Sequence, residues 1–189
     1  FTNSDSFEAG AFPPVLLDAG EYELVVGGGF TSGAYGFRML DLAASAQPLA
    51  GDGTLVQGTP TIANGTQAFA FTATAGERFA FQNIQQSART SLRLIDPSGR
   101  DITGPNFTNG AFTAELAGTY YILMEGQAFF AGPATPYQFR LWRPVNPPAA
   151  TLSLNTLTTV TIAQPTQVVT RTFTLTEPKR VYLDSFTDS

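Results

Sequence analysis

The chain has 189 residues, of which 13% are charged, and a formal net charge of −5 at pH 7. It contains no histidine and no cysteine, which excludes thiol chemistry, the usual zinc ligands and the Ser-His-Asp and Cys-His triads within this chain. Lysine occurs once and the carboxylates are scattered, so the composition argues against nucleic acid as a partner. No apolar stretch reaches the roughly 18 residues that a membrane span needs, and Phe1 does not begin a signal peptide. We therefore expect a mature product or a segment of a longer protein.

Alternation of apolar and polar residues with a period of two dominates the chain, whereas helical periodicity is scarce. Gly, Pro, Asn and Asp separate the alternating runs, as turns between strands do. The sequence therefore predicts an all-β fold made of tandem antiparallel β-sandwich units.

The first forty residues repeat a later part of the chain. An Ala-Gly-x-Tyr motif and a Tyr-x-Phe-Arg motif occur at residues 19–22 and 35–38, and again at residues 117–120 and 137–140. A period of about one hundred residues is typical of a domain array rather than of a solenoid. Residues 1–44 are therefore interpreted as the C-terminal part of a first sandwich unit.

The middle of the chain, residues 45–146, is interpreted as one complete unit. Aromatic and aliphatic residues share inward faces on successive predicted strands, and these rows comprise Phe69 and Phe71, Phe79 and Phe81, Leu92 and Leu94, Tyr120 to Met124, and Tyr137 to Leu141. The turn at residues 96–99, Asp-Pro-Ser-Gly, combines a fixed φ at Pro with a residue that tolerates positive φ. These rows predict one core between two sheets.

The last part of the chain repeats the beginning of the complete unit. Thr-Ile-Ala at residues 61–63 and Phe-Thr at residues 71–72 recur at residues 161–163 and 173–174. Residues 147–189 are therefore interpreted as the N-terminal part of a third unit. Compared with the complete unit, the first partial unit is shorter by about the length of the Leu92–Gly99 strand, and the sequence does not identify the element that replaces this strand.

The ordered set of motifs in residues 54–142 resembles the bacterial pre-peptidase C-terminal domain. These motifs are Phe69–Phe81, Leu92–Gly99, Leu116–Met124 and Tyr137–Leu141. The resemblance implies a jelly-roll-like sandwich of the kind found beside secreted peptidases and in large bacterial surface proteins. It therefore implies an extracellular or cell-surface location in a bacterium.

Carboxylates are the remaining candidates for chemistry. Asp96 and Asp101 flank the Pro-Ser-Gly turn and are weak candidates for calcium, which takes about six to eight oxygen ligands. Asp96 with Asp101, or Glu115 with Glu125, could form a catalytic pair, although turn aspartates more often bond their own backbone. We predict no catalytic residue and no cofactor, with calcium as the open alternative.

Some aromatic residues fall on faces that should be wet. Tyr121, Leu123 and Trp142 lie opposite the inward rows, and Phe129 and Phe130 lie in an apparent loop. Contiguous exposed aromatics mark contact surfaces, so all five are interface candidates. The alternative is that a loop or linker of the same chain covers them.

We therefore expect a non-enzymatic extracellular structural repeat protein that builds a fibre, sheath or adhesive stalk. Its partners would be copies of itself joined head to tail, or neighbouring repeats of a longer array, because an open sheet edge accepts further strands. Two alternatives remain. One is an accessory substrate-binding module of a secreted peptidase or hydrolase, and the other is a carbohydrate-binding module that uses Trp142 and Tyr121.

Overall fold

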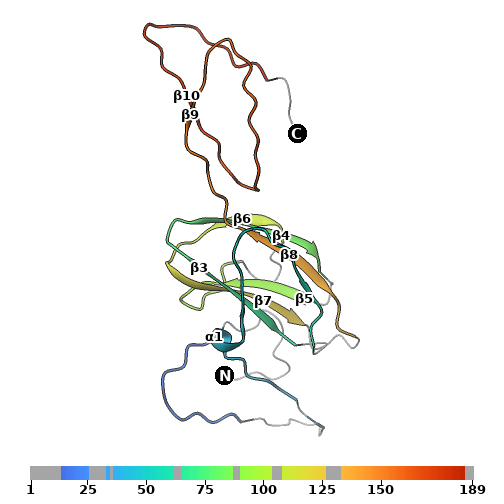
Figure 1. Cartoon of the computed structure of the whole chain (residues 1–189). Coiled ribbons are helices and arrows are strands. Elements are labelled where there is room, and N and C mark those ends of the chain that lie inside the picture. Colours follow the sequence, from blue (N-terminus) through green and yellow to red (C-terminus); the bar gives the residue numbers. More distant parts are fainter. Residues whose placement is uncertain are drawn as a thin grey trace. The chain divides into compact units, whose positions relative to one another are not determined.

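The computed structural model (Figure 1) describes residues 14–25, 33–34, 36–61, 65–86, 90–103, 108–126 and 133–185. The chain divides into two compact units, Phe1–Pro144 and Val145–Ser189. The elements are α1 (Leu42–Ser45), β1 (Gln47–Pro48), β2 (Val56–Gly58), β3 (Gln67–Ala73), β4 (Arg78–Gln85), β5 (Thr90–Ile95), β6 (Gly110–Thr113), β7 (Gly118–Gly126), β8 (Tyr137–Trp142), β9 (Ala150–Thr151) and β10 (Arg171–Thr172). The prediction of an all-β fold is confirmed.

Strands β1 to β8 of the first unit form two four-stranded sheets. One sheet has the order β1-β3-β7-β5 and the other has the order β2-β8-β4-β6. All neighbouring strands in them are antiparallel except β1 and β3, which are parallel. Strands β7 and β8 are therefore internal, whereas β5 and β6 each lie at the end of a sheet.

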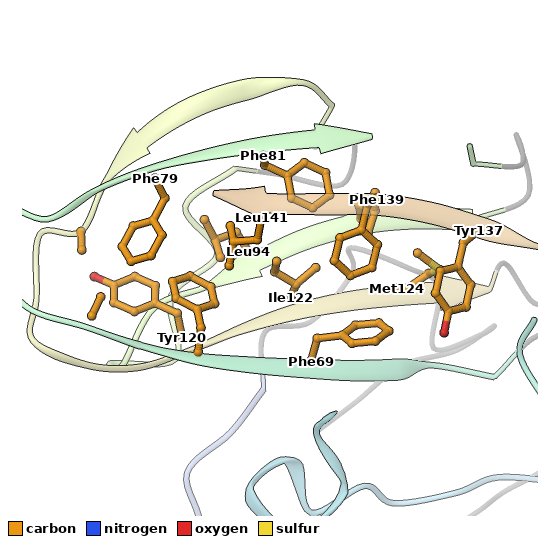
Figure 2. Close-up of a cluster of buried hydrophobic side chains, with 14 residues drawn as sticks. Phe69, Phe79, Phe81, Leu94, Tyr120, Ile122, Met124, Tyr137, Phe139 and Leu141 are labelled. Carbon is orange, nitrogen blue, oxygen red and sulfur yellow. The ribbon is translucent and has the colours of Figure 1, made fainter. Parts of the chain in front are cut away.

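The core lies between the two sheets, where rings and aliphatic side chains from both sheets point toward one another (Figure 2). Phe69 of β3 meets Phe139 of β8 edge to face, with ring centroids 5.0 Å apart. Phe71 stacks on Tyr120 at 5.5 Å within the sheet that contains β3 and β7. Every inward row predicted from the alternation is buried here, so the predicted core is confirmed.

The predicted turn between β5 and β6 has the expected conformation. Gly99 adopts a φ of +86°, and its amide donates to the carbonyl oxygen of Asp96 at 2.9 Å. A residue with a Cβ adopts a positive φ only at a cost in conformational energy, which explains why glycine occupies this position.

The sheet that contains β7 is also covered on its outer face. Ala68, Ile95 and Leu123 are buried there, and Leu42 and Ala46 pack against them from α1 and the residue after it. Asp41 begins this short helix, because its carboxylate accepts a hydrogen bond from the amide of Ala44 at 3.1 Å. The segment between the first partial unit and the complete unit therefore serves as a third layer.

The second unit has very little regular structure. Its only described strands are β9 and β10, which run parallel and are two residues long. No described residue of this unit is buried. The unit therefore has strand-like sequence without a core of its own.

Candidate interaction surfaces

Two of the predicted interface residues lie beneath the chain's own α1 layer. Leu123 is only 3% exposed, and Tyr121 is half-buried against the same cluster. The side chains of Leu42 and Ala46 cover this face. At Tyr121 and Leu123 the apolar face is therefore covered by the same chain, which is the alternative stated in the sequence analysis.

Trp142 lies at the end of β8, with its ring packed against the backbone of Gly53. A Cβ at Gly53 would lie only 2.2 Å from Cζ3 of the indole, and Gly53 has a φ of +81°. The ring is therefore half-buried, with one side occupied by the chain. Phe129 and Phe130 lie outside the described residues.

The two calcium candidates are both engaged by the protein. The Asp96 carboxylate accepts hydrogen bonds from the amide and hydroxyl of Ser98 and from the amide and Nε of Arg100. Burial acts to raise the pKa of Asp96, but these hydrogen bonds outweigh it and hold the pKa below its usual value. Asp101 lies 3.8 Å from Arg93 and accepts from the amide of Thr103.

The two glutamates considered as a catalytic pair bind different arginines. Glu115 accepts from Arg100 at 2.6 Å, whereas Glu125 accepts two hydrogen bonds from Arg93, at 2.8 Å from Nε and 2.5 Å from Nη2. Arg93 and Glu125 are 4% and 8% exposed. The sequence analysis missed this buried pair. Its signal was an arginine and a glutamate on a face that was otherwise apolar.

The described residues of positions 14–40 are named here the head segment. None of them lies in a strand. Within it, the Tyr22 hydroxyl donates to the carbonyl oxygen of Asp18 at 2.8 Å. In the complete unit the Tyr120 hydroxyl donates to the carbonyl oxygen of Leu116 at 2.9 Å. This is the tyrosine corner of β-sandwich domains, and both copies of the Ala-Gly-x-Tyr motif form it.

The head segment exposes the residues that match the core of the complete unit. Tyr22 and Leu24 match the buried Tyr120 and Ile122, and both are exposed. Phe37 and Met39 match Phe139 and Leu141, and they are 60% and 72% exposed. Exposed apolar side chains in this alternating order are typical of a strand that lacks its sheet.

Residues 145–185 are named here the tail segment, and they repeat one strand pairing of the complete unit. In that unit the amide of Leu49, just after β1, donates to the carbonyl oxygen of Ala70 in β3 at 2.7 Å. In the tail segment the amide of Leu152 donates to the carbonyl oxygen of Thr172 at 2.7 Å. Strands β9 and β10 are therefore equivalent to β1 and β3, and Thr172 is equivalent to Ala70.

The same equivalence identifies the core positions of the tail segment. Phe173, Val181 and Leu183 correspond to the buried Phe71, Phe79 and Phe81. All three are exposed in the tail segment, and Leu183 is 88% exposed. Both ends of the chain thus present unpaired, core-like rows.

The described residues contain neither a candidate membrane span nor a candidate metal cluster. No helix in them has the length and hydropathy needed to cross a membrane. In the same part of the chain, no group of three or more His, Cys, Asp or Glu residues lies together in a way that could hold a metal ion.

The chain matches no protein-family model and no curated protein sequence. Among solved structures it is similar to PliG of Aeromonas hydrophila, a periplasmic inhibitor of g-type lysozyme, with 14% identity and a TM-score of 0.42 over 51% of this chain and 92% of that one. PliG of Salmonella Typhimurium gives 12% identity and a TM-score of 0.41 over 51% and 97%. The pre-peptidase C-terminal domain of a Bacillus anthracis collagenase gives 14% identity and a TM-score of 0.41 over 51% and 93%. Each of these three matches spans 51% of this chain.

Proposed function

We propose that this chain is a non-enzymatic, extracellular structural repeat protein whose two end segments are completed by strands of another unit. When the partner is a second copy, head-to-tail completion gives an open fibre, sheath or adhesive stalk. When the partner is an adjacent repeat of the same polypeptide, the chain is one segment of a longer covalent array. In both cases the tail segment supplies the strands that begin a sandwich, and the head segment supplies the strands that finish it.

One observation carries the proposal. The tail segment holds equivalents of β1, β2, β3 and β4, and among these four strands only β1 and β3 are neighbours in the complete sandwich. That is the pairing that the tail segment forms, as β9 and β10. Strands β2 and β4 are each paired with β8, whose equivalent lies in the head segment. The tail segment therefore forms the one strand pairing that it can make by itself, and its equivalents of β2 and β4 are left without the β8 equivalent that would pair with them.

The head segment supports the same interpretation. Its strand equivalents, β7 and β8, belong to different sheets of the complete unit and do not pair with each other. Accordingly, the described part of this segment keeps its tyrosine corner, which is a local contact, and forms no strand. Apart from β5, which has no counterpart in the repeat, the strands that each end lacks are those that the other end provides.

The non-enzymatic part of the proposal rests on composition and on the fate of the carboxylates. The chain has no histidine or cysteine. Its candidate acid–base groups, Glu115 and Glu125, are paired with arginines, as is Asp96. A general base needs a free lone pair aimed at a substrate proton, and these groups are engaged within the fold.

Sedimentation velocity of the full chain and two tail variants tests the proposal. Phe173→Asp puts a charge at a core-equivalent position, whereas the control Thr174→Asp changes the next residue, whose counterpart Thr72 is exposed. We expect wild type and Thr174→Asp to form species larger than the 20.1 kDa chain, and Phe173→Asp to stay monomeric. A wild-type monomer at every concentration, or equal behaviour of the two variants, would refute the proposal.

A further inference from the structure

We propose that the head segment of one copy pairs with the tail segment of a second copy in one fixed register, as the end strand of one sheet and as an internal strand of the other. This inference rests on the proposed function and specifies its contact. Residues 20–25 would pair with residues 170–175 in one sheet, and residues 37–40 with residues 182–185 in the other. Both pairs are antiparallel.

The register of the first sheet follows from the β3–β7 pairing. There Phe71 lies opposite Tyr120, and Ala70 lies opposite Tyr121. Thr172 is equivalent to Ala70, and the tyrosine corner makes Tyr22 equivalent to Tyr120. Tyr22 is therefore expected opposite Phe173, with its ring stacked as Tyr120 stacks on Phe71. Glu23 then lies opposite Thr172 on the outer face.

The register of the second sheet follows from the β4–β8 pairing. Phe81 lies opposite Leu141, and Gln82 lies opposite Arg140. The repeat replaces the first pair by Leu183 and Met39, which are the most exposed core-equivalent residues of their segments. It replaces the second pair by Asp184 and Arg38, whose charges are opposite. Cross-strand pairs of opposite charge stabilise a sheet, and this register pairs an apolar residue with an apolar residue and a negative charge with a positive one.

The strand that the composite unit lacks does not interrupt either sheet. The sequence between the tail segment and the next head segment has no counterpart of β5. In the complete unit β5 lies at the end of its sheet and pairs with no other strand than β7 among the strands described, although Leu92 and Leu94 also contribute to the core. Removing it leaves the order β1-β3-β7 continuous, so the composite sandwich keeps every internal pairing.

The composite unit of head and tail segments also lacks counterparts of both members of the buried Arg93–Glu125 ion pair. Arg93 lies on β5, which has no counterpart, and the position that matches Glu125 is Gly27. A glutamate kept there without its arginine would be a buried, unpaired charge, which is strongly destabilising. The two losses together are what a unit that folds without β5 requires.

Arg171 is the one charged residue at a core-equivalent position. It corresponds to Phe69, whose ring meets Phe139 (Figure 2). The head segment supplies Phe37 at the position of Phe139. In the composite unit the guanidinium of Arg171 is therefore expected to lie against the Phe37 ring, and this cation–π contact offsets part of the cost of burying its charge.

Cysteine cross-linking of the full chain tests the register, because the native sequence has no cysteine. Antiparallel partners have Cα atoms about 4.5–5.5 Å apart, which a disulfide spans. Oxidation of the Glu23→Cys/Thr172→Cys variant should therefore give a ladder of covalent multimers on a non-reducing gel. In the control Glu23→Cys/Phe173→Cys, the second cysteine points to the opposite face, and we expect little cross-linking.

The outcomes separate the register from the proposed function. Multimers in solution with a ladder from the control variant alone would overturn the register and leave head-to-tail assembly in place. A cross-linked monomer from the Glu23→Cys/Thr172→Cys variant would mean that each head segment closes on its own tail segment, which overturns insertion into a second copy. If the wild-type chain sediments only as a 20.1 kDa monomer at every concentration, both the register and the proposed assembly function are overturned.

Discussion

Tyr22 and Tyr120 make the same hydrogen bond, each from its hydroxyl to the carbonyl oxygen of the residue four positions earlier, at 2.8 and 2.9 Å. Tyr120 is fully buried in a sandwich, whereas Tyr22 is exposed. The corner is therefore a local structure that forms without its sheet, and it places the following residues for pairing.

This relationship predicts different effects for the same substitution at the two sites. Tyr120→Phe removes the corner from the complete unit and should lower its free energy of unfolding by about 1 kcal/mol. Tyr22→Phe should leave that free energy unchanged and weaken assembly instead. Urea unfolding of the complete unit and sedimentation velocity separate the two effects. Equal loss of stability in both variants would contradict the equivalence.

The contact between Gly53 and the Trp142 ring predicts a strong effect of a single methyl group. Gly53→Ala should lower the free energy of unfolding by about 1–2 kcal/mol because of the positive φ at this position. Displacing the Trp142 ring should lower it by about 1–3 kcal/mol more. Gly76 also has a positive φ, of +85°, but has open space around its Cβ position. Gly76→Ala is therefore the matched control, and its unfolding midpoint in urea should fall less. Equal shifts would argue against the ring contact.

The buried pair of Arg93 and Glu125 predicts a non-additive double-mutant cycle. Arg93→Met leaves the Glu125 carboxylate buried without its main cation and should destabilise the sandwich by about 3–5 kcal/mol. The double variant Arg93→Met/Glu125→Leu removes both charges and should recover much of this loss. Chemical unfolding of these two variants and of the single variant Glu125→Leu gives the three free energies that the cycle needs. A double variant as unstable as the sum of the single variants would show that the pair is not coupled.

The hydrogen bonds to Asp96 predict a loss of stability in acid. Because they hold the folded-state pKa below the usual value of 3.8, the carboxylate stabilises the fold above that pH. The contribution is lost as the pH falls through the lower, folded-state pKa. Asp96→Asn should therefore be less stable than wild type at neutral pH, with the difference disappearing in acid.

Urea midpoints measured across the acid range test this pH dependence. Glu177→Gln, which removes a tail-segment carboxylate whose side chain is 69% exposed, is the control and should leave the curve of the sandwich unchanged. A difference between wild type and Asp96→Asn that stays constant with pH would contradict the role of the carboxylate.

The sequence predicted the core well because alternation at Phe69, Phe79 or Tyr120 reports directly which side of a strand is buried. It could not predict that Leu42 and Ala46 cover the outer face at Leu123, since this contact joins segments far apart in the chain. For the same reason the parallel pairing of β1 and β3 was not foreseen. Such a pairing depends on topology rather than on a local pattern.

The exposed apolar surfaces lie elsewhere than the sequence predicts, for a related reason. The sequence predicts interface residues in the complete unit, where the chain itself half-buries Tyr121 and Trp142. The larger apolar surfaces lie on the two partial units, at residues such as Phe37 and Leu183. The repeat pattern had marked these segments as incomplete, but only the register of the complete unit indicates how they would fit together.

A mixing experiment with two one-ended variants tests head-to-tail completion most directly. Phe173→Asp disables the tail segment and Leu24→Asp disables the head segment, and each change leaves the complete sandwich untouched. Each variant alone should sediment as a 20.1 kDa monomer, and an equimolar mixture should give a one-to-one dimer of twice that mass and nothing larger. A mixture that remains monomeric, or a single variant that still polymerises, would contradict the account.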